Sequence, residues 1–355
     1  MVIPAAATAP PAQRLPGIDA LKALACVLII WHHLAFYGPM SDVVHHAAPG
    51  LMDWLYTYGR MAVQVFLVVG GFLAACSLAP KGVAVFQQPG RLILRRYRRL
   101  ALPLMVAVFI TVAVAALVRP WLAGDSVPDA PTFWQLLSHI FLLQDVLGQE
   151  ALSAGIWYVA IDFQLFVISV AVLSLLRDTR HRWLVLALAA VSLLYVNRVA
   201  GLDATGLYFF GSYALGMLAW WASRSTQPAR WLLAIAVLGG LALALDFRGR
   251  ILVAVVVALG LVGLQRGLWT ARWLQAPGLL QLGQISYSVF LIHFPVCLLV
   301  NAFVSHFWPT QLLANTLGLL AAFLLSLLAG AALYRGVESP HAPLRAWRRN
   351  RLMPQ

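Results

Sequence analysis

The chain has 355 residues, of which 62% are hydrophobic and only 10% are charged. A water-soluble domain carries about a quarter charged residues, so this composition excludes an ordinary soluble protein. It predicts an all-α polytopic membrane protein with no separate soluble domain. The formal net charge is +13, but the basic residues follow the membrane topology described below, so nucleic-acid binding is not needed to explain them.

The apolar runs predict about ten transmembrane helices. In chain order they cover residues 18–37, 61–79, 100–118, 156–176, 183–197, 205–222, 231–246, 251–265, 281–304 and 312–334. The segment 133–148 is too short and polar for a span, and we expect it to be interfacial or re-entrant. Residues 1–14 are rich in Pro and Ala and are expected to form a disordered cytosolic segment. Residues 15–340 then form one membrane domain, followed by a basic cytosolic tail over residues 341–355.

The distribution of Lys and Arg predicts the orientation of the chain. With the N-terminus in the cytosol, 20 of the 25 Lys and Arg residues fall on the cytosolic side. The basic residues on the outer side are Arg60, Arg119, Arg198, Arg248 and Arg250, and most acidic residues lie on that side as well. We therefore expect a multi-pass protein of the inner (plasma) membrane with both termini in the cytosol.

The first predicted span carries ionisable residues, which are costly in a bilayer and usually mark a function. Lys22 and His33 are eleven residues apart. This spacing is close to three helical turns, so the two side chains share a face and lie about 16 Å apart along the axis. His32 points away from that face. The alternative interpretation is a packing histidine together with a lysine that extends to the cytosolic interface.

An arginine cluster precedes the third predicted span. Five arginines lie in "RLILRRYRRLALP", and Arg96 and Arg99 are one helical turn apart. Basic residues at a cytosolic boundary anchor a span in the membrane. Two arginines on one helix face also suit a phosphate group, which they bind with bidentate geometry.

Polar side chains also occur in two later spans. Asp162 and Gln164 lie early in the fourth span, within "GIWYVAIDFQLFVI". A buried carboxylate among aromatic residues is expected either to take part in chemistry or to pair with an arginine. The ninth span, within "LGQISYSVFLIHFPV", carries Ser286, Tyr287 and His293.

Taken in order, these motifs resemble the acyltransferase-3 family of integral membrane acyltransferases. The family's basic residue, followed after ten intervening residues by His, is matched within "IDALKALACVLIIWHH". The segment "RRYRRLALP" matches its Arg-x-x-Arg pattern followed by Pro. Three further strings, "YFFGSYALG", "LGQISYSVFLIHFPV" and "VESP", match later landmarks of the family. The resemblance extends over nearly the whole chain, from about Leu15 to Pro340.

Two positions depart from the family pattern. The second span, "VQVFLVVGGFL", has Gly70 where the family usually has Ser. The segment "WYVAIDFQLF" has Asp162 where the family usually has Glu. Both departures bear on the details of the site and leave the family assignment in place.

The resemblance implies transfer of an acyl group, often acetyl, from cytosolic acyl-CoA to a hydroxyl of an envelope or exported glycan. His33 is then the catalytic base or acyl carrier, and Asp162 is expected to orient its imidazole. The cations expected to bind the acyl-CoA are Lys22, Arg96 and Arg99. The side chains expected to contact the acceptor are Gln164, Ser286, Tyr287 and His293. No metal is expected.

Two other classes of function stay open at this point. Buried charges also line transport paths, so a transporter or flippase for a lipid-linked or anionic substrate is the main alternative. Gly70, in place of the usual Ser, leaves open a non-catalytic membrane scaffold or sensor. Release of CoA from labelled acetyl-CoA by the purified protein separates an acyltransferase from both.

Overall fold

The computed structural model describes residues 15–122, 127–175, 181–268 and 272–339, and these residues form helices without β-strands. The α-helices are α1 (Pro16–Phe36), α2 (Pro39–Ala47), α3 (Pro49–Tyr58), α4 (Ala62–Leu78), α5 (Pro89–Val118), α6 (Phe133–Ile140), α7 (Trp157–Leu175), α8 (His181–Leu194), α9 (Gly206–Arg224), α10 (Pro228–Leu245), α11 (Gly249–Gln265), α12 (Pro277–Phe307) and α13 (Leu312–Leu333). The short turns are η1 (Gly59–Met61), η2 (Val196–Arg198), η3 (Arg272–Gln275) and the π-helical η4 (Tyr334–Glu338). The segments predicted as a disordered N-terminus and a basic tail lie outside the described residues.

Every predicted apolar run contains a helix, and the largest difference in bounds is at the third run. Helix α5 begins at Pro89, so the arginine cluster is helical and continuous with the span predicted over residues 100–118. Pro is well placed in the first helical turn, where its missing N–H has no intrahelical partner to lose. The segment 133–148 contains only the eight-residue α6 followed by turns, as expected for a stretch that does not cross the membrane.

Seven segments of the described chain are long and apolar enough to cross a membrane. They are α1, α5, α7, α10, α12 and the continuous stretches Pro49–Leu78 and Leu312–Glu338. Helices α8 and α11 have 14 and 17 residues, and α9 is less apolar because it carries Gly, Ser, Tyr and Trp. The protein is therefore an all-helical membrane protein, while the predicted count of about ten spans is not confirmed.

The helices α2 and α3 were not predicted. Both begin at a proline, and α3 continues through η1 into α4, so the stretch before the second predicted span is helical as well. Polar residues such as Ser41, Asp42 and Asp53 interrupt its apolar positions. Hydropathy alone therefore gave no long run there.

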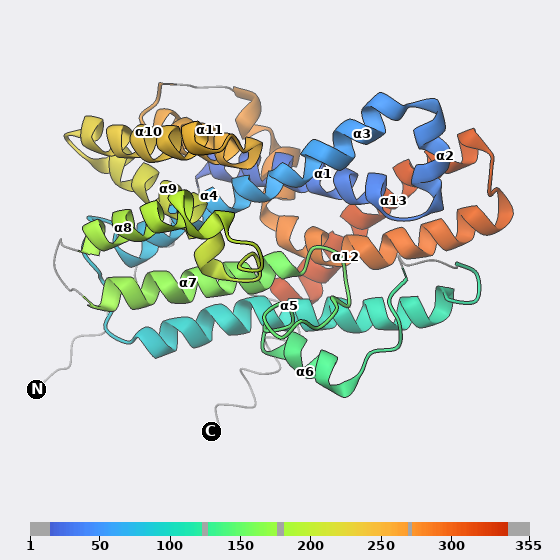
Figure 1. Cartoon of the computed structure of the whole chain (residues 1–355). Coiled ribbons are helices and arrows are strands. Elements are labelled where there is room, and N and C mark those ends of the chain that lie inside the picture. Colours follow the sequence, from blue (N-terminus) through green and yellow to red (C-terminus); the bar gives the residue numbers. More distant parts are fainter. Residues whose placement is uncertain (1–14, 123–126, 176–180, 269–271, 340–355) are drawn as a thin grey trace, which may run out of the picture.

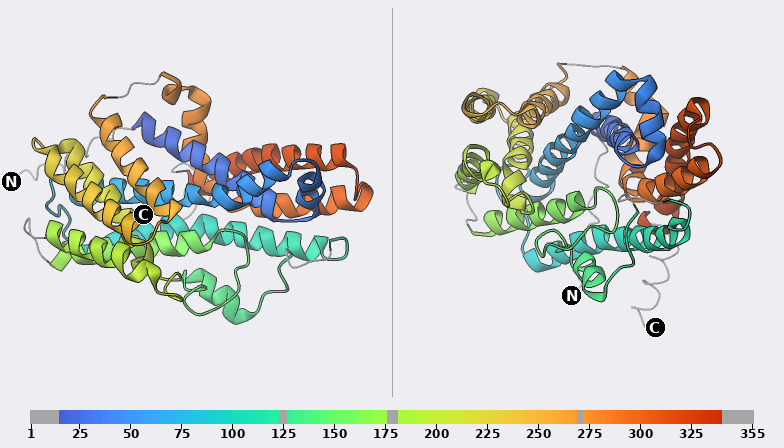
Figure 2. Two further views of the ribbon diagram at one scale, coloured as in Figure 1. Left: turned by 45° about the horizontal axis from the view of Figure 1, so that its top comes forward. Right: turned by 45° about the vertical axis from the view of Figure 1, so that its right-hand side comes forward.

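The bundle has two halves, and the long helix α5 runs along both of them (Figures 1 and 2). In one half α9 packs against α4, α8, α10 and α11, and in the other α12 packs against α1, α5 and α13. Glycines allow the closest approach, between α4 and α9. A Cβ on Gly71 would overlap the carbonyl oxygen of Tyr213, and a Cβ on Gly216 would overlap that of Val68. Small residues at helix contacts are the usual way to bring membrane helices together.

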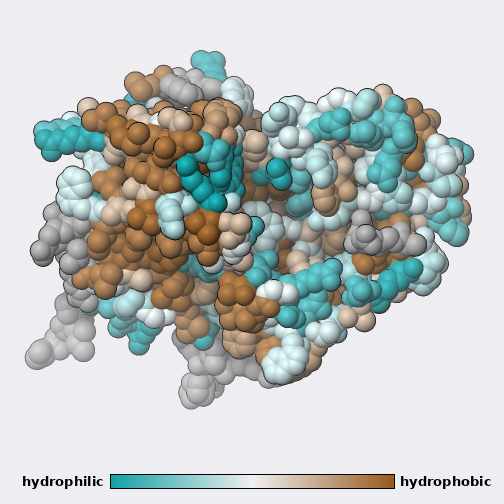
Figure 3. Space-filling view, viewed as in Figure 1, coloured by the Kyte–Doolittle hydropathy of each residue, from teal (hydrophilic) through white to brown (hydrophobic). Residues whose placement is uncertain are grey.

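Large apolar side chains cover the outward faces of the peripheral helices. Leu233 and Leu245 on α10 are 64% and 61% exposed, and Leu313 and Leu328 on α13 are 72% and 67% exposed. Figure 3 shows a broad hydrophobic surface over the half that contains α10 and α11. In a membrane protein such faces contact lipid, so their exposure needs no partner chain to explain it.

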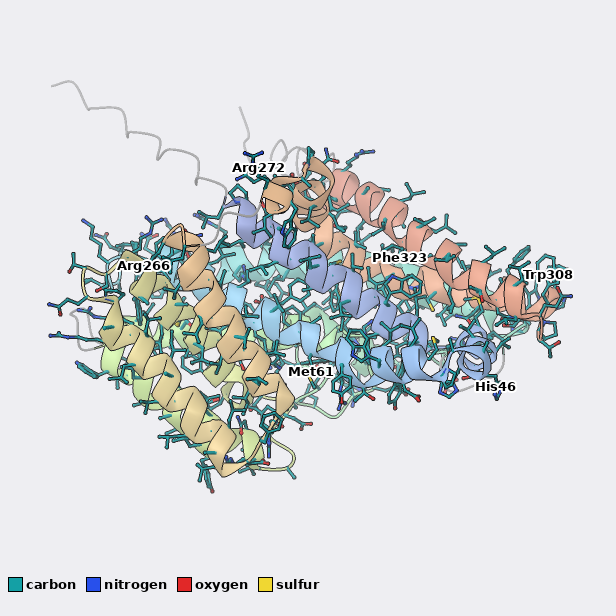
Figure 4. The ribbon with its side chains drawn as sticks, turned by 90° about the horizontal axis from the view of Figure 1, so that it is seen from above. His46, Met61, Arg266, Arg272, Trp308 and Phe323 are labelled. Atoms are coloured by element: carbon teal, nitrogen blue, oxygen red, sulfur yellow. The ribbon has the colours of Figure 1, made fainter. Side chains whose placement is uncertain are left out.

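The two ends of the bundle carry the residues expected on opposite sides of the membrane. Figure 4 shows Arg266 and Arg272 at one end, and His46 and Trp308 at the other. The predicted topology assigns the first pair to the cytosol and the second pair to the outer side. Which end faces the cytosol stays a prediction.

Candidate functional site

His33 of α1 and His293 of α12 form a hydrogen-bonded pair in the interior. The Nδ1 atom of His33 is 2.7 Å from Nε2 of His293. The ring planes differ by only 9° and the ring centroids are 4.7 Å apart, so the two imidazoles are nearly parallel. Both side chains are buried, with exposed fractions of 8% and 1%. The two helices can come close because Gly283 of α12 has no side chain. A Cβ at this position would overlap the backbone of Asp19 of α1.

The hydrogen bonds determine which nitrogen of each neutral ring carries the proton. The Nδ1 atom of His293 is 2.6 Å from the carbonyl oxygen of Phe290, which can only accept, so this Nδ1 is protonated. The Nε2 atom of His293 then accepts the bond from the Nδ1–H of His33. The Nε2 of His33 keeps its lone pair, and it has no hydrogen-bond partner among the described residues. A neutral imidazole in this form is suited to take a proton from a hydroxyl group.

The segment before α7 lies directly against His33. Gly155 has a φ of +73°, and a Cβ there would be 3.0 Å from Cε1 of His33 and 2.9 Å from the ring of Phe290. The position therefore needs glycine for its left-handed backbone and for the close approach. Because Cε1 is bonded to Nε2, Gly155 limits the space beside the lone pair.

Arg96 of α5 and Asp162 of α7 form an ion pair in the interior. A guanidinium nitrogen of Arg96 is 2.6 Å from Oδ2 of Asp162, whose side chain is 7% exposed. The guanidinium also lies 5.4 Å from the centre of the Phe166 ring. Of the two partners expected for Asp162, the structure shows an arginine and not His33. The orienting contact to His33 that was expected from Asp162 is made by His293.

The remaining cations predicted to bind acyl-CoA lie on α1 and α5. Lys22 forms an ion pair with Asp19 one turn earlier, at 3.1 Å. Arg99 is exposed on α5, one turn beyond Arg96. The Tyr287 hydroxyl donates to the carbonyl oxygen of Leu100, the residue after Arg99, so α12 contacts this part of α5.

The other side chains predicted to contact the acceptor bond to backbone atoms. The amide oxygen of Gln164 accepts from a backbone N–H at 2.7 Å, and the hydroxyls of Ser286 and Tyr287 donate to carbonyl oxygens at 2.9 Å and 2.8 Å. The partner residues are Gly206, Gly283 and Leu100. The amide nitrogen of Gln164 is buried without a partner in the described part of the chain, so it retains a donor for a ligand.

Two contacts of the site were missed from the sequence. Gly155 gave no signal, because its role depends on which distant side chain it touches. His293 was expected to contact substrate, and its contact with His33 was not foreseen. The available signal was a second histidine within an apolar helix, which required a buried partner.

His32, the neighbour of His33, has a different environment. Its Nδ1 is 3.1 Å from the carbonyl oxygen of Leu55, so this ring links α1 to α3. The two adjacent histidines therefore serve different contacts, as the helical spacing indicated.

The fold and these contacts define a polytopic membrane protein with a buried, hydrogen-bonded histidine pair between its first and penultimate long helices. The chain belongs to the acyltransferase-3 family, whose acyltransferase domain matches residues 15–335. Membership indicates an acyltransferase embedded in a membrane. The chain is also similar to the Regulator of hypoxia-inducible factor 1 of Caenorhabditis elegans, with 28% identity over 210 residues. That match covers 55% of this chain and 41% of the length of the relative. No solved structure matches the chain.

Proposed function

We propose that the protein transfers an acyl group, in the simplest case acetyl, from cytosolic acyl-CoA to a hydroxyl of an envelope or exported carbohydrate. The observation that carries this proposal is the His33–His293 pair, which leaves an unprotonated Nε2 in the interior of an acyltransferase-3 chain. We place the reaction in the inner (plasma) membrane, with the donor arriving from the cytosol.

The proposed chemistry uses His33 as the general base. Its Nε2 takes the proton of the acceptor hydroxyl, and the hydroxyl oxygen attacks the thioester carbonyl carbon. The C–S bond then breaks, and the CoA sulfur leaves with the proton that His33 had taken. The products are the acyl ester and free CoA–SH, so atoms and protons balance. His293 acts as a positioning residue, because its Nε2 accepts the Nδ1–H of His33 and so holds the ring in the basic tautomer.

The donor fits the distribution of charge along the helices. Acyl-CoA has a polyanionic nucleotide at one end and a thioester about 15–20 Å away along its extended arm. Lys22 lies about 16 Å along α1 from His33, given the rise of a helix. Lys22 and Arg99 are therefore our candidates for the phosphates. Arg96 already bonds to Asp162, so its effect on the donor is expected to depend on that carboxylate.

The test compares adjacent histidines in one assay. Purified protein is incubated with radiolabelled acetyl-CoA, and release of free CoA and transfer of the label are measured. General-base catalysis contributes about 10²–10⁴-fold, so His33→Ala should lower CoA release by that factor. His32→Ala is the matched control and should keep most of the activity. A transporter or scaffold would release no CoA, and equal losses in both variants at normal expression would overturn the assignment.

A further inference from the structure

A cavity of about 800 Å³ opens beside Met61 and the start of α11, and Figure 4 shows Met61 about midway between Arg266 and His46. Its lining comes from five separate segments, which are the start of α4, the loop after α6 and the starts of α7, α9 and α11. In the predicted topology all of these segments lie on the outer side of the membrane. A cavity of this size is large enough for a sugar unit, since ligand pockets usually measure about 300–1,000 Å³.

More arginines than carboxyls line the cavity. Arg60, Arg248 and Arg250 line it, together with the carboxyls of Asp145 and Asp203. Burial raises the pKa of Asp145, so this carboxyl becomes protonated, and therefore neutral, at a higher pH than a free carboxyl. In addition, α7, α9 and α11 begin at the cavity, and helix N-termini carry partial positive charge.

The three arginines differ in how their guanidinium groups are engaged. Arg248 bonds to Asp246 and to the carbonyl oxygen of Asn197. Arg250 donates to the same carbonyl and to the Tyr208 hydroxyl, at 3.2 Å and 2.7 Å. Arg60 is exposed, and it makes no hydrogen bond or ion pair with any described residue. Two of the three cations are thus held in place by the fold, while Arg60 retains all of its donors.

Aromatic and amide groups complete the lining. Trp157 and Tyr208 are among the lining residues, and ligand pockets usually combine aromatic side chains with a few polar groups that fix the orientation of the ligand. Gln64 lines the cavity at 5% exposure. Its amide oxygen accepts from Ser212 at 2.8 Å, which leaves its NH₂ group without a partner among the described residues.

The cavity is separated from the histidine pair by the first turn of α7. Trp157 and Ile161 of this turn face the cavity, while Gly155, just before it, lies against His33. The next residue after Ile161 is Asp162, which pairs with Arg96. The start of α7 therefore borders the cavity and also contacts both elements of the candidate site.

We infer that this cavity binds the acceptor, and that it selects a carbohydrate carrying an anionic group, which Arg60, Arg248 and Arg250 bind. The anionic group is a carboxylate of a sugar acid or a phosphate on the sugar. The description of the ligand as the acceptor rests on the proposed function, whereas the binding of an anionic sugar does not. Charge-assisted hydrogen bonds from arginine to either group are among the stronger polar contacts in proteins.

Binding to the full-length purified protein is measured by calorimetry without acyl-CoA. The probes are trigalacturonate for the carboxylate, glucose 6-phosphate for the phosphate and maltotriose as the neutral reference. At least one anionic probe should bind about tenfold or more tightly than maltotriose. Preference for trigalacturonate identifies a sugar acid, and preference for glucose 6-phosphate identifies a phosphorylated sugar. Equal affinity for all three probes, or no binding of any, overturns the inference.

Three variants test the assignment of the cavity. Arg60→Gln should lower the affinity for the anionic probe by about tenfold or more. Asp145→Asn should raise this affinity, because a negative charge is removed from the lining. Arg119→Gln is the matched control, because Arg119 is also predicted on the outer side but donates to the Pro128 carbonyl, away from the cavity. Equal effects of Arg60→Gln and Arg119→Gln overturn the inference.

Binding of the anionic probe, measured beside CoA release, distinguishes failure of the cavity inference from failure of the proposed function. His33→Ala removes the proposed base but leaves the cavity lining intact, so it should still bind the anionic probe. If wild-type protein binds the probe but releases no CoA, the proposed function fails and the cavity stands. If CoA release depends on His33 but no anionic probe binds, the cavity inference fails and the enzyme assignment stands.

Discussion

Gly70 faces the carboxylate of Asp162. A Cβ placed on Gly70 would lie 3.6 Å from Oδ1 of Asp162 and 3.0 Å from the ring of Tyr213. The position where this chain departs from the family's usual Ser is therefore next to the Arg96–Asp162 ion pair. A serine hydroxyl there would reach the carboxylate, provided that the Tyr213 ring shifts by a few tenths of an ångström.

We expect Gly70→Ser to fold and to retain CoA release within about a factor of ten, because a new hydrogen bond offsets the tight contact with Tyr213. The neighbouring substitution Gly71→Ser is the matched comparison. Its Cβ would overlap the carbonyl oxygen of Tyr213, a backbone atom that cannot move independently of α9. Gly71→Ser should therefore abolish stable expression. Similar expression and melting temperature for both variants would contradict this account of the α4–α9 contact.

His293 should affect turnover without affecting the affinity for the donor. The variant His293→Ala removes the acceptor that holds the Nδ1–H of His33, so the basic tautomer of His33 is no longer favoured. We expect kcat to fall by about 10²-fold, with little change in the half-saturating acyl-CoA concentration. His293→Gln retains an acceptor and should recover part of the activity. A variant that changes only the half-saturating concentration would instead place His293 in the binding site, as the sequence first suggested.

The Arg96–Asp162 pair should be sensitive to the loss of one partner. Arg96→Ala leaves a buried carboxylate uncompensated, which costs about 3–5 kcal/mol of stability. The double variant Arg96→Met with Asp162→Leu removes both charges and should recover thermal stability. We expect turnover to stay low in the double variant, because Nε of Arg96 is buried without a partner in the described residues and so retains a donor for substrate. Recovery of turnover as well would make the pair a purely structural link between α5 and α7.

His139 should make the segment between α6 and α7 sensitive to acid. Its Nδ1–H donates to the carbonyl oxygen of Gln135, and its Nε2 accepts from the backbone N–H of Leu152. Burial lowers the pKa of His139 below the ordinary 6.5, although the Gln135 carbonyl opposes the shift. The unfolded chain therefore binds a proton at a higher pH than the folded one does. Stability is lost as the pH falls below about 6.5, and the loss ends once the folded His139 also protonates.

The measurement for His139 is the midpoint of thermal unfolding between pH 7.5 and pH 5. His139→Gln is the control, because glutamine provides a donor and an acceptor but does not titrate. The wild type should lose more stability than this variant over the interval, since the other histidines are common to both. If the unfolding midpoints of the wild type and His139→Gln change in parallel with pH, His139 does not contribute to the loss of stability in acid. Protonation would also loosen the loop that carries Asp145 to the cavity, so the affinity for an anionic sugar is worth measuring in parallel.

Local periodicity in the sequence was enough to predict several features. The runs of apolar residues located the long helices, and the eleven-residue interval between Lys22 and His33 distinguished His33 from His32. Local periodicity does not predict contacts between distant segments of the chain. The pairs His33–His293 and Arg96–Asp162 each join helices far apart in the chain, and a sequence pattern does not state which helix faces touch. The cavity is harder still to foresee, because Arg60 lies almost 190 residues before Arg248 and Arg250 in the sequence.

The separation of His33 and His293 also determines when the site can exist during synthesis. These residues are 260 positions apart, and α12 is followed only by α13 and η4 among the described elements. A ribosome that has synthesised α1 through α11 has therefore produced most of the protein without the His33–His293 pair. Under the proposed function, such a chain gains its catalytic base in working form only when the last helices insert beside α1. The loop before α12 is accordingly a natural place to divide the gene: two fragments, each inactive alone, should regain CoA release when they are expressed together.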